Sequence, residues 1–476
     1  MADGRLTRRQ LLAAAGGAAL GAAGIYELVD RLGAAPVRAA TTPIPHLPEQ
    51  HVVQALRVVD DGGVKVFEPP LHHQLVTATL RVDETPAALA EARAELEAKL
   101  KKLDDAYPST PAGLAVTVGW GLPYFRRYVP GQAARHLPFD RRASEARGRT
   151  VSVIEDAKPF PSDPAGVILE RNDLAVLIRS DSLERVREAS HSLFGEAGGG
   201  PFRVTSIRRG FVGGGFSGGQ SLPKKMAVAA RVPGADLIPD RAELFLGFTS
   251  TQASQPGRER ISNLETLGLA DLRGGYFAHG THMHLSHLFE DLEAWYLNFT
   301  HQQRVDTTFR PGLKVPAQRL SVAQGPEDIQ TSADVVRDYR RDNTIGHSGS
   351  IQPASRLDRD VTGPDGIVYE KGSPIPHRAD FNTLDNPFFW SADPGRDGYD
   401  STPKAGLHFV VFNPTSDDFR RGRLAMDGVL PNGKKLPFPH GSRGQGFNAV
   451  LTTTHRQNYL VPPRAHRSFP LSELRA

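Results

Sequence analysis

The first half of the chain alternates between stretches with the hydrophobic pattern of strands and stretches with that of helices. Runs rich in β-branched and apolar residues predict strands at 75–82, 114–120, 174–179 and 202–211. Helices are predicted at about 86–103 and, after an N-cap at Asp181 or Ser182, to about residue 194. The resulting order, β-α-β-β-α-β, is typical of a ferredoxin-like domain, in which two helices cover one face of a four-stranded antiparallel sheet.

The second half repeats this pattern more loosely. It predicts strands at 276–285 and 407–412 and helices at 288–303 and 417–426. An insertion over about 315–401 is rich in Gly, Pro, Asp and Arg, and a loop of that length is usually functional. We therefore expect an α+β fold of two ferredoxin-like halves, 41–225 and 226–476, with antiparallel sheets, as in the dimeric α+β barrel superfamily.

The first forty residues have the pattern of an export signal. Arg8 and Arg9 form a twin-arginine pair, and a mildly apolar, Gly-rich run follows over 11–25. We expect export by the twin-arginine (Tat) machinery to the periplasm, the cell envelope or the outside. Cleavage is expected near Ala39 or Ala40, with an uncleaved anchor as the alternative.

Composition and charge exclude several classes of site. The chain has no cysteine, so disulfides, thiolate metal ligands and a cysteine nucleophile are absent. Its 57 Lys and Arg residues nearly balance its 53 Asp and Glu residues, for a formal net charge of +4. Because charges this balanced imply no strongly basic surface that would attract nucleic acid, no nucleic-acid partner is expected.

Four strings resemble, in this order, those of the dye-decolorising peroxidases, a haem family. They are LAVTVGWGLPYF (114–125), NDLAVLIRSDSLERVREASHSLF (172–194), GGYFAHGTHMHL (274–285) and GLHFVVFNPTSDDF (406–419). The resemblance implies haem b as cofactor, with hydrogen peroxide and a small organic reductant as substrates. It leaves a homo-oligomer open.

Two positions of that family have matches here. The resemblance implies that His347, which opens a segment ending in Pro353 and Arg356, is the axial ligand of the haem iron. Asp417 or Asp418 is then a candidate partner for the second ring nitrogen. Arg378 matches the distal arginine, whose guanidinium holds peroxide and stabilises charge as the O–O bond breaks.

The third position departs from the family pattern. Gly247 and Phe248 match the start of the Gly-x-x-Asp-Gly motif, and we expect both to contact haem. Ser250, however, stands where the family has its catalytic Asp, and a serine is not a base near neutral pH. The alternatives to a peroxidase are therefore a non-catalytic haem protein that senses haem or handles iron, and a haem-free module that keeps the fold.

A histidine cluster adds a further candidate site. His279, His282, His284 and His287 fall close together, and His282 and His284 share one face if the segment is a strand. These two histidines could bind a metal such as Zn or Cu, or line the haem edge near its propionates, or be ordinary polar residues. The sequence leaves the three interpretations open.

Overall fold

A computed structural model describes residues 26–29, 41–44, 46–60, 65–195, 200–213, 215, 221–248, 261–263, 268–317, 329–386 and 402–475. The first half has the predicted β-α-β-β-α-β order. Its elements are β4 (His72–Leu80), α3 (Pro86–Ala106), β5 (Ala115–Gly121), β7 (Leu174–Ser180), α7 (Leu183–Phe194) and β8 (Phe202–Phe211). Thr85 and Ser182 cap the two helices by accepting hydrogen bonds from backbone N–H groups.

The second half supplies the matching strands. They are β10 (Thr281–Glu290), β13 (His377–Arg378), β14 (Phe381–Thr383), β15 (Gly406–Asn413) and β16 (Leu451–Val461), with α12 (Ser416–Met426) packed on β10 and β15. β10 lies between β15 and β16 and pairs antiparallel with both. The mixed α+β fold with antiparallel sheets is thus confirmed.

The strands of the two halves join into one closed ring. Going round it, the order is β10, β15, β14, β8, β4, β7, β5 and β16, and β16 pairs back onto β10. The halves meet where Asn382 of β14 pairs with Phe211 of β8, and where Tyr459 and Leu460 of β16 pair with β5. This ring fits the expected barrel-like architecture.

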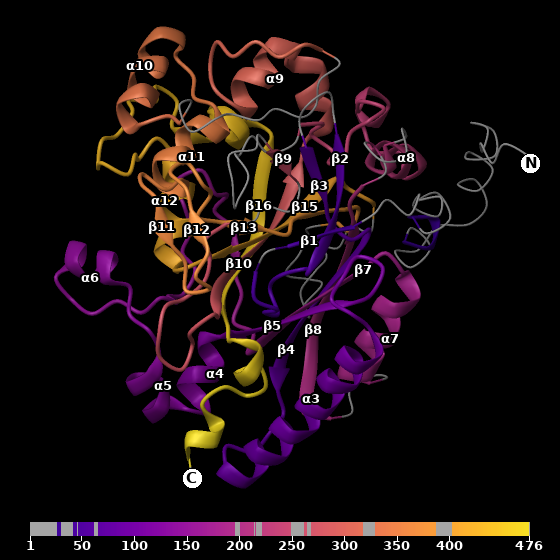
Figure 1. Cartoon of the computed structure of the whole chain (residues 1–476). Coiled ribbons are helices and arrows are strands. Elements are labelled where there is room, and N and C mark those ends of the chain that lie inside the picture. Colours follow the sequence, from indigo (N-terminus) through magenta and orange to yellow (C-terminus); the bar gives the residue numbers. More distant parts are fainter. Residues whose placement is uncertain are drawn as a thin grey trace, which may run out of the picture.

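Alternation along the strands creates separate layers of core. Leu75 and Leu177 join a buried apolar cluster with Met283, Phe412 and Tyr459, which come from the strands of the second half. Their neighbours along β4 and β7 belong to a different cluster, under α3 and α7. In Figure 1, α3 and α7 cover the lower end of the molecule, whereas α11 (His347–Ser355) and α12 lie side by side at the upper left. The second half therefore has its own helix-covered sheet face.

Two predictions around 276–303 are wrong. β10 begins at Thr281 and continues to Glu290, where the sequence predicted a helix from 288. The strand persists because its residues pair on both sides, with β15 and β16, and this tertiary pairing overrides local propensity. The expected long helix is divided into a π-helical turn (Ala294–Asn298) and α9 (His301–Thr308).

The insertion at 315–401 is structured where it is described. It contains α10 (Ser332–Asp342), α11, the hairpin of β11 (Val361–Thr362) and β12 (Val368–Tyr369), and strands β13 and β14 of the ring. The insertion thus builds part of the second half. A separate small sheet combines β1 (Thr41–Pro43), β2 (Ala55–Asp60), β3 (Lys65–Glu68) and β9 (Ile261–Asn263). The remaining elements are α4 (Leu122–Arg127), α5 (Pro130–His136), α6 (Arg141–Arg147), β6 (Ile168–Leu169) and α8 (Leu222–Ala229).

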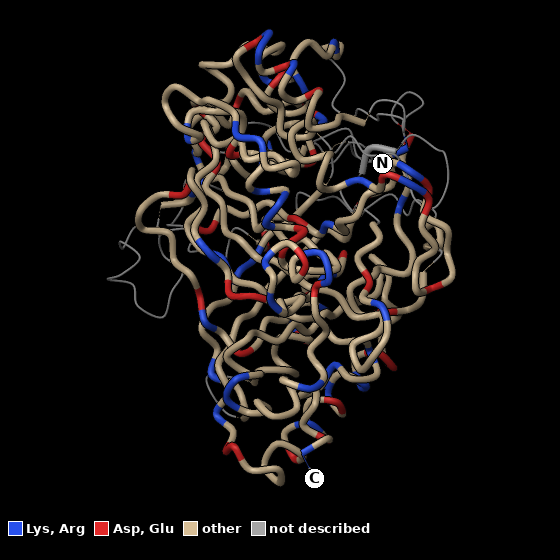
Figure 2. Tube along the Cα trace, turned by 90° about the vertical axis from the view of Figure 1, so that its left-hand side faces the viewer, with Lys and Arg blue, Asp and Glu red and all other residues tan. Residues whose placement is uncertain are grey.

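Most of the predicted export signal lies outside the described residues. Within the described part of the chain, no helix combines the length and the apolar character that a membrane span needs. Basic and acidic residues are interspersed along the trace in Figure 2, which agrees with their near balance in the sequence.

Candidate functional site

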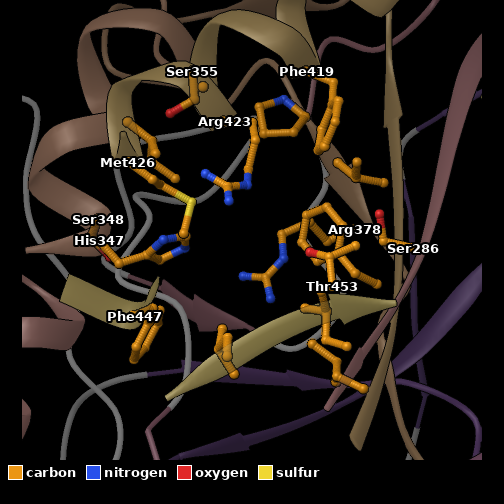
Figure 3. Close-up of a pocket in the computed structure, with 18 of the residues that line it drawn as sticks. Ser286, His347, Ser348, Ser355, Arg378, Phe419, Arg423, Met426, Phe447 and Thr453 are labelled. Atoms are coloured by element: carbon orange, nitrogen blue, oxygen red, sulfur yellow. The ribbon is translucent and has the colours of Figure 1, made fainter. Parts of the chain in front are cut away.

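A large pocket lies between the outer face of the second-half sheet and helices α11 and α12. Including its open mouth, it encloses about 1640 Å³ of space. Alternate residues of β15 and of the second half of β10 face it, as strand geometry requires. The lining includes Ser286, Leu288 and Glu290 of β10, Leu407, Phe409 and Val411 of β15, His347 and Ile351 of α11, and Phe419, Arg423 and Met426 of α12. Figure 3 shows His347, Arg378 and Arg423 with their polar ends directed toward one another.

His347 is the first residue of α11, and its position depends on a glycine. A Cβ on the N-cap residue Gly346 would lie 2.2 Å from the backbone oxygen of Phe309, so only glycine allows the helix to start there. Burial in the pocket, together with the charges of Arg378 and Arg423, lowers the pKa of His347 to about 3. The imidazole is therefore neutral near pH 7, the form that binds metals.

The predicted partner of His347 is wrong. Its buried Nδ1 has no hydrogen-bond partner among the described residues. Asp417 accepts a hydrogen bond from Arg147 at 3.0 Å, and Asp418 accepts one from Arg142 at 2.6 Å. Both carboxylates thus join α12 to two arginines of α6 and are not directed to His347.

Arg378 projects from the short strand β13 into the same pocket. Its Nε donates to Oδ2 of Asp380 at 2.8 Å, and its Nη2 donates to the same oxygen. Asp380 is in turn fixed by the backbone N–H of Val410, which donates to Oδ1 at 3.0 Å. The guanidinium is therefore held in one orientation by a buried carboxylate, which leaves its remaining N–H groups for a ligand.

Glu290 is a functional candidate that the sequence did not reveal. It is the last residue of β10, lines the pocket and is buried, and its Oε2 has no hydrogen-bond partner in the described part of the chain. Burial, and secondly the charge of Asp380, raises the pKa of Glu290 to about 8. The sequence predicted a helix from residue 288, so Glu290 was not recognised as a strand residue. In the strand, alternation from Ser286 through Leu288 places Glu290 on the pocket face.

Two further arginines line the pocket, each paired with an aspartate. Arg423 donates to Asp427 at 3.0 Å, and Arg456 donates to Asp163. Both arginines and Asp163 line the pocket. Burial and the nearby charge of Arg423 lower the pKa of Arg456. Asp163 and Asp427 act in the opposite direction, and the net result is a pKa of about 10. The two guanidiniums can bind carboxylates of a ligand.

The segment that begins at Gly247 is described only as far as Phe248. Phe248 lines the pocket and contacts Phe309, with 5.2 Å between ring centroids. Gly247 has a positive φ of 91°, and a Cβ there would lie 3.3 Å from the hydroxyl of Tyr296. Ser250 lies outside the described residues, so its place in the pocket stays a prediction.

His282 and His284 lie beside the pocket but are not among the residues that line it. The nitrogens of His284 are hydrogen-bonded to Asn458 and Ser286, both at 2.7 Å, and its ring stacks on Phe419 at 3.5 Å between centroids. Since both of its nitrogens have protein partners, His284 is not arranged as a metal ligand. Burial lowers the pKa of His282 to about 3. Cofactor contact by this pair stays a prediction.

Comparison with solved structures gives distant likenesses. A DyP-type peroxidase from Cellulomonas bogoriensis is 18% identical, with 84% of this chain and 94% of that chain covered and a TM-score of 0.49. A dye-decolorizing peroxidase from Bacteroides thetaiotaomicron is 12% identical, with 84% and 95% covered and a TM-score of 0.46. Likenesses this distant carry no argument about function. No curated protein matches the chain.

The family to which the sequence belongs is nevertheless clear. One family model matches residues 70–463, which is more than half of the chain and includes both strand sets of the ring. The chain therefore belongs to the DUF7405 family, a family of unknown function.

Proposed function

We propose that the chain is an exported haem protein of the peroxidase type, which oxidises a small organic reductant with hydrogen peroxide. Haem b would occupy the pocket between the second-half sheet and α11 and α12. The observation that carries the proposal is His347, a neutral imidazole that faces an apolar cavity with the guanidinium of Arg378 directed toward it.

The residues present fit a haem group. Haem needs apolar walls for its ring, a nitrogen donor for its iron and cations for its two propionates. Leu407, Phe409 and Val411 are among the apolar lining residues. His347 offers the donor, and Arg423 and Arg456 offer the cations. The buried Nδ1 of His347 leaves Nε2 as the nitrogen available to the cavity.

In the proposed reaction, haem and the surrounding protein residues have separate roles. Bound haem supplies the redox chemistry by which peroxide is reduced and the organic donor is oxidised. His347 would hold the iron, and Arg378, oriented by Asp380, would bind peroxide and stabilise negative charge on it. Glu290, in its ionised form, would accept a proton from peroxide at Oε2 and return it to the oxygen that leaves as water.

The whole chain, expressed with ample haem, provides the test. We expect a Soret band in the purified protein and oxidation of a reducing dye that requires hydrogen peroxide. A colourless protein would favour the haem-free module and overturn the proposal.

A non-catalytic haem protein is the second candidate, and Ser250 favours it because the serine removes the acid–base group of the related family. A Soret band without turnover would support this candidate. A large gain of activity in Ser250→Asp would show that the native pocket lacks an efficient proton-transfer group.

Arg378→Lys tests the role of the guanidinium. Lysine keeps the positive charge but loses the planar fork that Asp380 orients, so kcat/KM for hydrogen peroxide is expected to fall by about 10²- to 10³-fold. Steady-state kinetics at a fixed dye concentration measures this. Arg141→Lys, at an exposed position of α6, is the matched control. Equal kinetics in both variants would remove Arg378 from the mechanism.

Export is tested separately from catalysis. Replacing Arg8 and Arg9 together with lysine is expected to leave the chain in the cytoplasm, because the twin-arginine route reads that pair. Immunoblots of cytoplasmic and exported fractions measure the distribution, and Arg31→Lys is the control. Unchanged export of the double variant would contradict the proposed route.

A further inference from the structure

We infer that His46, His51 and Asp271 form a binding site for a divalent transition-metal ion, with zinc as the ion that suits this donor set best. One ligand atom from each residue can be chosen so that all three lie within 4.8 Å of one another. Imidazole nitrogens with a carboxylate oxygen are typical zinc ligands. None of the three lines the haem pocket, so the inference stands independently of the proposed function.

The distances are close to those of a metal site. Nε2 of His46 lies 3.3 Å from Oδ2 of Asp271, and Nε2 of His51 lies 2.9 Å from Oδ1 of the same carboxylate. Donor atoms at about 2.1 Å from a tetrahedral zinc are about 3.4 Å apart. Small movements of the side chains would therefore be sufficient to admit the ion.

The ring of His46 is oriented as a metal ligand is. Its Nδ1 is hydrogen-bonded to the backbone oxygen of Leu47 at 2.8 Å, which directs Nε2 toward Asp271. A hydrogen bond from the second ring nitrogen to a backbone carbonyl is the usual support of a metal-binding histidine, because it fixes the ring and its tautomer.

A second carboxylate, that of Asp365, lies beside the site. The two carboxylates together carry the two negative charges that a divalent ion would neutralise. Oδ2 of Asp365, in the turn between β11 and β12, lies 3.8 Å from Nε2 of His46. The side chains of Asp271 and Asp365 are only 3% and 1% exposed. No lysine or arginine of the described residues forms an ion pair with either of them. Buried carboxylates need a positive partner, and Asp365 could become a fourth ligand.

The cluster also contains a buried polar atom that needs a partner. The buried Nδ1 of His51 has no hydrogen-bond partner among the described residues. Nε2 of the same ring lies 2.9 Å from Asp271, so His51 has one nitrogen at the carboxylate and one buried nitrogen without a protein partner, which is uncommon for a buried polar atom.

The rest of the fold holds the segment of His46 and His51 in place. The backbone oxygen of Gln50 accepts a hydrogen bond from Thr117 of β5 at 2.6 Å, and its side-chain oxygen accepts one from the backbone of Val118 at 2.8 Å. His51 also packs against Phe412 of β15, with 5.8 Å between ring centroids. A metal ion here would join the segment that precedes β2 to the second half of the chain.

Metal analysis of the intact chain is the first test. After incubation with zinc chloride and dialysis, we expect close to one zinc ion per chain by atomic emission, beyond any haem iron. Cobalt(II) should replace it and give visible d–d absorption bands typical of a site with few ligands. Retention of only trace zinc by the folded wild-type chain would overturn the inference.

Variants then locate the ion. His46→Gln and Asp271→Asn are each expected to lower zinc affinity by about tenfold or more, because each removes a ligand. His191→Ala, at an exposed position of α7, is the matched control and should bind zinc as the wild type does. Far-UV circular dichroism checks that each variant is folded. Folded ligand variants that keep wild-type affinity would show that the ion binds elsewhere and contradict the site.

Discussion

Replacing His347 with alanine is expected to remove the Soret band of the purified protein or to shift it strongly. The pocket has apolar walls and two arginines that the proposed function assigns to propionates, and the neutral imidazole directed into it from α11 is the group proposed to hold the iron. Without that ligand, haem keeps only apolar contacts and ionic contacts at its edge. Absorption spectra recorded during haem titration of the two proteins measure the change.

A control variant distinguishes loss of the haem ligand from loss of folding. His440→Ala, at an exposed position, is the matched control and should bind haem as the wild type does. The His347 ring lies next to Phe447, 4.9 Å away between centroids, at the open pocket, so its removal is not expected to unfold the chain. Identical Soret bands and haem affinities in His347→Ala and the wild type would overturn the assignment of the ligand.

The first-half strands could be predicted from sequence because each is a short apolar run between turn residues. β4, β7 and β8 are found where their β-branched residues indicate them. β10 was harder, because its buried positions include histidine, serine and glutamate instead of uniformly apolar residues. The sequence pattern alone does not show that β15 and β16 enclose this strand from both sides.

The candidate site could be predicted only where a local motif marks it. His347 and Arg378 could be named from the sequence because the short segments around them resemble those of the dye-decolorising peroxidases. Glu290 and the group of His46, His51 and Asp271 depend on contacts between distant segments. No spacing rule brings His46 to Asp271, because the contact arises only when the segment before β2 folds against the second half.

Glu290→Gln is expected to lower kcat/KM for hydrogen peroxide by about 10²- to 10⁴-fold, the contribution of a positioned acid–base group. Glutamine keeps the size of the side chain but can neither accept nor return the proton. Since only the ionised carboxylate accepts a proton, wild-type kcat/KM should rise with pH and level off above the pKa of about 8. The variant should lack this rise, and Glu145→Gln, on the exposed α6, should keep it.

Stability gives a second readout of Glu290 that does not depend on turnover. Its pKa is raised from 4.5 to about 8 in the folded chain, so folding favours the protonated form. The unfolded state loses this proton at lower pH, and the free energy of unfolding therefore falls as pH rises between about 4.5 and 8. Glu290→Gln removes that loss, so its thermal unfolding midpoint near pH 8 should equal or exceed that of the wild type. An inactive variant that is also less stable at pH 8 would indicate a structural role for Glu290. A fully active variant with an unchanged pH profile would assign proton transfer to another group.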